Sequence, residues 1–89
     1  MTDKYVVVGT NDCKWCDKAV GLLRDRGEAF VYYDTSIFRD IAALLRGFSL
    51  TTVPQVWHVD EGITHIGGYV ALSGYLAVKD ELKEQQNAY

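Results

Sequence analysis

The sequence lacks any apolar run long enough to cross a membrane. Its first apolar run, residues 5–8, is far shorter than the roughly 20 residues of a spanning helix or the roughly 7 to 15 apolar residues of a signal peptide. A basic cluster is also missing, because 9 lysines and arginines are scattered among 12 acidic residues, for a net charge of -3. We therefore expect a cytoplasmic protein with no membrane and no nucleic-acid partner.

Cysteine and histidine are scarce, which limits the metal sites that the chain can build. Its two cysteines are Cys13 and Cys16, and its two histidines are His58 and His65. A structural zinc site takes four such ligands, so it would need both histidines, whose spacing is wider than these sites use. We expect no metal, and keep as an alternative a non-catalytic module that holds zinc or a partner through the two cysteines.

Internal repeats, linkers and low-complexity segments are absent as well. A chain of 89 residues cannot build two cores, so we expect a single domain, residues 1–89, and a monomer. Apolar residues make up 48% of the chain, which is enough for a core that folds without disulfide staples.

Four segments are rich in β-branched and aromatic residues and predict strands. They lie at 5–8, 29–33, 55–59 and 63–66, and the short turn at 60–62 predicts that the last two form a hairpin. The first of these runs is continuously apolar, which is typical of a central strand buried on both faces.

Three further segments repeat apolar residues at helical spacing. Their predicted limits are Cys13 and Gly27 for the first helix, a cap at Thr35 or Ser36 and an end at Gly47 for the second, and a cap at Ser73 for the third. The order βαβαββα predicts an α/β fold, with a four-stranded mixed sheet flanked by three helices that cover both of its faces.

The two cysteines open the first predicted helix, directly after a strand. Cys16 falls on the apolar stripe of that helix and should be buried. Cys13 falls off the stripe at the helix start, where unpaired N–H groups and the helix dipole favour an anion, and Lys14 and Lys18 add positive charge. We predict that Cys13 attacks disulfides as a thiolate and that Cys16 resolves the resulting mixed disulfide.

Together with two later motifs, this pair makes the sequence resemble a known family. The three motifs are Cys13-Lys14-Trp15-Cys16, Thr51-Thr52-Val53-Pro54-Gln55-Val56 and His65-Ile66-Gly67-Gly68. Over nearly the whole chain, the sequence resembles the glutaredoxins, small members of the thioredoxin superfamily, and within them the dithiol class and its short bacterial and phage-type members.

The resemblance implies a thioredoxin fold and a glutathione-dependent thiol–disulfide oxidoreductase. Glutathione would be its co-substrate, and disulfide-containing proteins such as ribonucleotide reductase would be its partners. The resemblance also implies a cis peptide bond before Pro54 and a glutathione groove beside the nucleophile. The groove residues that it implies are Trp15, Thr52, Val53, Pro54, Gly67, Gly68 and Tyr69.

The chain departs from the family pattern on either side of this groove. The family commonly has proline and tyrosine between the cysteines, where this chain has Lys14 and Trp15, and a basic residue where it has Thr10. An acidic residue that usually follows the double glycine is replaced here by the segment 69–71, which is uncharged. Arg39 is a candidate ligand for a glutathione carboxylate.

These departures leave the electron source open. A dithiol protein of the same class that is reduced by thioredoxin reductase is therefore a second alternative. The lost acidic residue favours it, whereas the C-terminal signature usual in that group is absent.

Overall fold

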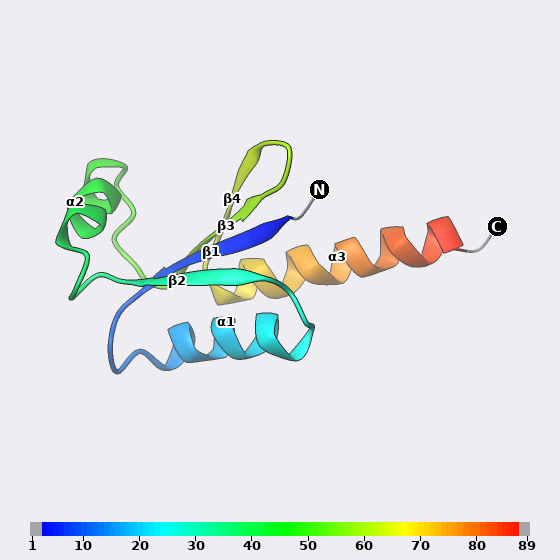
Figure 1. The fold of residues 1–89 in the computed structure, drawn as a ribbon, viewed down its shortest axis with the longest axis horizontal. Helices are drawn as coiled ribbons and strands as arrows, with labels where there is room; N and C mark the ends of the chain where they lie inside the picture. Colours follow the sequence, from blue (N-terminus) through cyan, green and yellow to red (C-terminus); the bar gives the residue numbers. More distant parts are fainter. Residues whose placement is uncertain (1–2, 88–89) are drawn as a thin grey trace.

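The computed structural model describes the backbone of residues 3–87 and the side chains of residues 3–82. The elements follow the predicted order. They are β1 (Lys4–Gly9), α1 (Lys14–Asp25), β2 (Phe30–Asp34), α2 (Arg39–Gly47), β3 (Gln55–Val59), β4 (Ile63–Gly67) and α3 (Tyr69–Asn87) (Figure 1). Within the described residues, no helix is long and apolar enough to span a membrane.

The four strands form one mixed sheet in the order β2-β1-β3-β4. Strand β1 pairs parallel with β2 and antiparallel with β3, and β3 pairs antiparallel with β4. Val7 and Val8 of β1 point to opposite faces of the sheet, and both are buried. The prediction that the first strand is central is therefore confirmed.

Helices α1 and α3 pack side by side on one face of the sheet, as Figure 1 shows. Between these helices and the sheet lies the core, which consists of Tyr5, Val7, Ala19, Leu23, Val56, Leu72 and Leu76. Figure 1 shows that α2 lies beyond the carboxyl end of β2 rather than over the second face of the sheet. Its apolar stripe consequently buries Leu45 and leaves Leu44 and Phe48 exposed.

Two helices begin at residues other than the predicted caps. Helix α2 begins at Arg39 rather than after Thr35 or Ser36, because the Asp34 carboxylate accepts hydrogen bonds from the backbone N–H and the hydroxyl of Ser36. These two bonds hold the segment in a turn instead of a helix.

The predicted end of α1 is confirmed, because Gly27 follows it with a φ of 70°.

Helix α3 begins at Tyr69, one full turn before the predicted cap at Ser73. Gly67 ends β4 with a φ of 121°, a conformation that favours glycine and turns the chain directly into the helix. The N–H of Leu72 already donates to the Gly68 carbonyl at 2.9 Å. The helix therefore starts at the double glycine.

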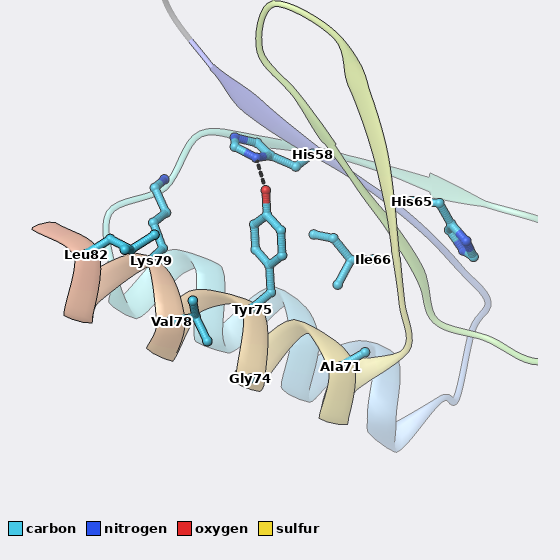
Figure 2. Close-up of a pocket in the computed structure, with 9 residues that line it drawn as sticks. All are labelled: His58, His65, Ile66, Ala71, Gly74, Tyr75, Val78, Lys79 and Leu82. Atoms are coloured by element: carbon cyan, nitrogen blue, oxygen red, sulfur yellow. Dashed lines mark hydrogen bonds between the residues drawn. The ribbon is translucent and has the colours of Figure 1, made fainter.

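A buried histidine joins α3 to the sheet. His58 of β3 stacks on the ring of Tyr5, with ring centroids 4.5 Å apart, and its Nδ1 lies 2.6 Å from the hydroxyl of Tyr75 on α3 (Figure 2). Its Nε2 lies 3.0 Å from the Asp3 carboxylate. Both ring nitrogens thus have partners, which offsets the cost of burying a polar group. These contacts fix the position of α3 relative to the sheet.

Candidate active site at the amino end of α1

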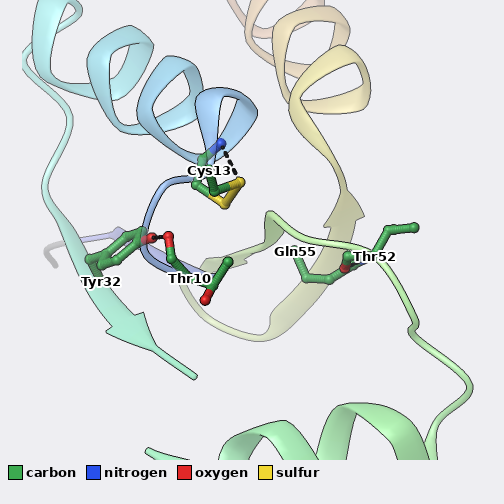
Figure 3. The surroundings of a disulfide bond; sticks show 6 residues. Thr10, Cys13, Tyr32, Thr52 and Gln55 are labelled. Carbon is green, nitrogen blue, oxygen red and sulfur yellow. Dashed lines mark hydrogen bonds between the residues drawn. A yellow bond between two sulfur atoms is a disulfide. The ribbon is translucent and has the colours of Figure 1, made fainter. Parts of the chain in front are cut away.

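Cys13 is the N-cap residue of α1 (Figure 3). Its backbone is extended, with a φ of -112° and a ψ of 105°, and its Sγ accepts a hydrogen bond of 3.1 Å from the N–H of Cys16. A sulfur at this position lies against the positive end of the helix dipole and against N–H groups that have no partner within the helix. The helix start therefore favours the thiolate form of Cys13 once the pair is reduced.

The two cysteines differ in exposure. Cys13 is half-buried, whereas Cys16 is fully buried, and Ala19 and Leu23 are buried on the same side of the helix. The predicted difference in burial between the two cysteines is confirmed. The pair forms a disulfide, with the two Cα atoms 5.2 Å apart. This arrangement suits a disulfide that forms and breaks reversibly, with one cysteine partly exposed and the other buried.

Two lysines carry positive charge in the first two turns of α1, which Cys13 caps. The Nζ of Lys18 lies 4.5 Å from the centroid of the Trp15 ring, a cation–π contact that keeps the ammonium beside the first turn of α1. Lys14 is exposed at the first position of the helix. Asp12, which precedes Cys13, is exposed in a left-handed turn with a φ of 54°.

A small cavity of about 260 Å³ lies against the exposed ring of Trp15. Its lining brings together six of the seven residues predicted for the groove, and the seventh, Gly67, lies next to them in the chain. The full lining is Trp15, Thr52, Val53, Pro54, Gly68, Tyr69, Val70 and Ala71. Neither cysteine lines this cavity, so the helix start and the groove are adjacent rather than merged.

One wall of this groove is the loop before β3. The Val53–Pro54 peptide bond is cis, as the resemblance implied. The buried side chain of Gln55 donates to the carbonyl of Thr52 at 3.0 Å and to its hydroxyl at 3.2 Å, and it also pairs with His65 at 2.8 Å. Gln55 therefore anchors the loop to the hairpin. It was not predicted, although a polar residue that begins a buried strand is a usable signal for such an anchor.

The opposite wall is formed by aromatic and uncharged residues. The rings of Trp15 and Tyr69 lie with their centroids 5.7 Å apart, one on α1 and the other at the start of α3. The first turn of α3 carries no acidic residue, and its Val70 is 77% exposed. Arg39, the other candidate for binding glutathione, is exposed at the first residue of α2 and does not line the groove.

The two histidines have partners other than the cysteines. His58 is bonded to Tyr75 and Asp3, and His65 is bonded to Gln55. In the part of the chain that the structure describes, no three histidine, cysteine or acidic side chains gather as a metal site would require.

The strand that leads into the site ends in a close packing contact at Gly9. A Cβ on this residue would lie 2.3 Å from the hydroxyl oxygen of Tyr32 and 2.8 Å from the Sγ of Cys16. Both distances are shorter than real Cβ contacts, so a side chain at this position would force Tyr32 or Cys16 to move. The proximity of Tyr32 to the cysteine pair was not predicted, because it depends on how β2 pairs with β1.

A sequence model of the glutaredoxin family, described simply as glutaredoxin, matches residues 5–63, more than half of the chain. The chain belongs to the glutaredoxin family. The matched segment contains both cysteines and the loop with the cis peptide bond, and it ends before the double glycine. No curated protein sequence matches the chain significantly.

Two solved structures resemble the glutaredoxin described here. Glutaredoxin 1 from Francisella tularensis, complexed with cacodylate, has a TM-score of 0.63 at 24% identity, and the match covers 93% of this chain and 99% of that one. Reduced Escherichia coli glutaredoxin has a TM-score of 0.61 at 27% identity, and that match covers 90% of this chain and 98% of that one. The fold is the thioredoxin fold, and the chain is a thiol–disulfide oxidoreductase.

The contact at Gly9 predicts the effect of adding a single methyl group. Gly9→Ala forces Tyr32 or Cys16 to move, and overpacking of this kind typically costs about 1–3 kcal/mol. Gly21→Ala is the matched control, because a Cβ there meets nothing within 4 Å and alanine favours the helix. Urea unfolding of both oxidised variants measures the difference. Equal stability of the two variants would contradict the packing described at the end of β1.

Proposed function

We propose that this chain is a glutathione-dependent glutaredoxin that reduces protein disulfides and glutathione mixed disulfides. The observation that carries the proposal is the difference between the two sulfurs: Cys13 caps the helix and is accessible, whereas Cys16 is fully buried. Proteins such as ribonucleotide reductase are the proposed disulfide substrates. The proposed form is a cytoplasmic monomer that consists of one domain.

Reduction of a protein disulfide begins when the Cys13 thiolate attacks one substrate sulfur. The other substrate sulfur leaves as a thiolate and takes up a proton. Cys16 then loses its proton and attacks the Sγ of Cys13, which forms the intramolecular disulfide and releases the second substrate thiolate. Two electrons pass from the dithiol to the substrate, and two glutathione molecules return them, leaving as oxidised glutathione.

Deglutathionylation takes a shorter route through the same nucleophile. The Cys13 thiolate attacks the glutathione sulfur of the mixed disulfide, and the other thiolate leaves. A second glutathione thiolate then attacks the Cys13–glutathione disulfide, which yields oxidised glutathione and restores the Cys13 thiolate. Cys16 takes no part in this cycle.

The groove beside Trp15 is the proposed site for glutathione. Its lining supports this role, because it combines two aromatic rings, the loop before β3 and Gly68 at the start of α3. We assign glutathione binding to Trp15, Thr52, Val53, Pro54, Gly67, Gly68 and Tyr69. The start of α3 carries no acidic residue for the amino group of glutathione, but its backbone N–H groups favour a glutathione carboxylate.

A second candidate function is that of a dithiol protein reduced by thioredoxin reductase. The observation that favours it is the first turn of α3, which carries no acidic residue to bind the amino group of glutathione. The cysteine chemistry is the same in both candidates, so only the electron source distinguishes them.

A coupled assay identifies the electron source. The protein is mixed with a small mixed disulfide and NADPH, together with either glutathione and glutathione reductase or thioredoxin reductase alone. We expect NADPH oxidation in the first mixture only. Turnover with thioredoxin reductase alone would replace the proposed function by the second candidate, and turnover in neither would refute both.

The two cysteines are expected to respond differently to serine substitution. Cys13→Ser abolishes both activities, because it removes the nucleophile. Cys16→Ser abolishes the reduction of protein disulfides that depends on both thiols, but it retains deglutathionylation. Parallel assays with a protein disulfide and a glutathione mixed disulfide measure the two activities. A greater loss of deglutathionylation in Cys16→Ser than in Cys13→Ser would overturn the assignment.

A further inference from the structure

The hydroxyl of Tyr32 lies close to the buried sulfur of the cysteine pair. The Tyr32 Oη and the Cys16 Sγ are both within 3 Å of the point that a Gly9 Cβ would occupy, at 2.3 Å and 2.8 Å. The two atoms are therefore no farther apart than the sum of these distances. Because Gly9 has no side chain, no methyl group separates them.

A thiolate at Cys16 needs a hydrogen-bond donor. Cys16 is fully buried, and a buried charge without a hydrogen bond is strongly disfavoured. Its own N–H is already used, because it donates to the Sγ of Cys13. Yet the resolving step requires Cys16 as a thiolate, and reduction of the disulfide at Cys13 leaves Cys16 as a thiolate.

The hydroxyl of Tyr32 is suited to be that donor. At present it donates to the Thr10 carbonyl over 3.2 Å, which is longer than most O–H···O hydrogen bonds and leaves the O–H bond free to turn (Figure 3). Burial raises the pKa of Tyr32, and the nearby charges of Asp34 and Asp17 raise it further, so the phenol retains its proton. It can then donate a hydrogen bond without becoming an anion itself.

We propose that Tyr32 acts on Cys16: its hydroxyl turns from Thr10 toward the sulfur and donates a hydrogen bond to the Cys16 thiolate. This inference rests on the proposed role of Cys16 as the resolving thiol. When an incoming thiolate attacks the Sγ of Cys13, the Cys13–Cys16 bond breaks and Cys16 receives the electron pair. Tyr32 stabilises this leaving group, and in the opposite direction it stabilises the attacking thiolate.

A polar cleft is lined by Tyr32 and by residues of α1, and neither cysteine lines it. The cleft has a volume of about 470 Å³, and Tyr32 forms part of its wall. The charged groups around Tyr32 are Asp12 before α1, Asp17 and Arg24 on α1, and Asp34 at the end of β2. Tyr32, rather than Cys16, is therefore the group that borders the cleft.

Thiol titration of single-cysteine variants tests the proposal without using catalysis. In the Cys13→Ser background, where Cys16 is the remaining thiol, its pKa is followed by thiolate ultraviolet absorbance. We expect Tyr32→Phe to raise the Cys16 pKa by about one unit, roughly a tenfold loss of thiolate at a fixed pH. In the Cys16→Ser background, the same substitution leaves the Cys13 pKa unchanged.

Tyr33→Phe is the matched control, because it removes the same hydroxyl from the next residue of β2, on the opposite face of the sheet. Circular dichroism confirms that each variant is folded. An unchanged Cys16 pKa in Tyr32→Phe, or an equal shift in Tyr33→Phe, would overturn the proposal. Neither result bears on the electron source. If the enzyme were inactive but Tyr32→Phe still raised the Cys16 pKa, the proposed function would be refuted and the role of Tyr32 would stand.

Discussion

The packing at the end of β1 is the constraint on which the site depends. The strand ends at Gly9, and the missing side chain leaves room for the sulfur of Cys16 beneath the strand and for the hydroxyl of Tyr32 beside it. Because Cys16 is buried here, Cys13, three positions earlier, lies at the amino end of α1. The exposure of Cys13 is thus a consequence of how its partner is packed.

This difference divides the chemistry between two sides of the molecule. On one side, the accessible sulfur lies near a groove built from Trp15, a cis peptide loop and the start of α3. On the other side, the buried sulfur lies near the phenol of Tyr32, and this phenol lines a polar cleft. The groove proposed for glutathione offers aromatic rings and no acidic side chain at the start of α3. Positive charge comes from Lys18, which is held against the Trp15 ring.

The sequence was sufficient to predict the element order and the unequal burial of the two thiols, because both follow from the spacing of apolar residues. It was not sufficient for features that depend on a single hydrogen bond or on strand register. The start of α2 is delayed by the Asp34 side chain, and the start of α3 is advanced by the positive φ of Gly67. The position of Tyr32 near Cys16 depends on the register in which β2 pairs with β1. A shift of β2 by one residue would move the Tyr32 side chain to the opposite face of the sheet.

Competitive alkylation of the reduced protein tests the central claim most directly, because it compares the two thiols in the same molecule. The reduced protein is treated with limiting iodoacetamide near neutral pH, and peptide mass spectrometry then measures the modification of each cysteine. The accessible, helix-capping thiolate at Cys13 is predicted to react first, with Cys16 left as a free thiol. Equal modification of both cysteines, or faster modification of Cys16, would contradict the account.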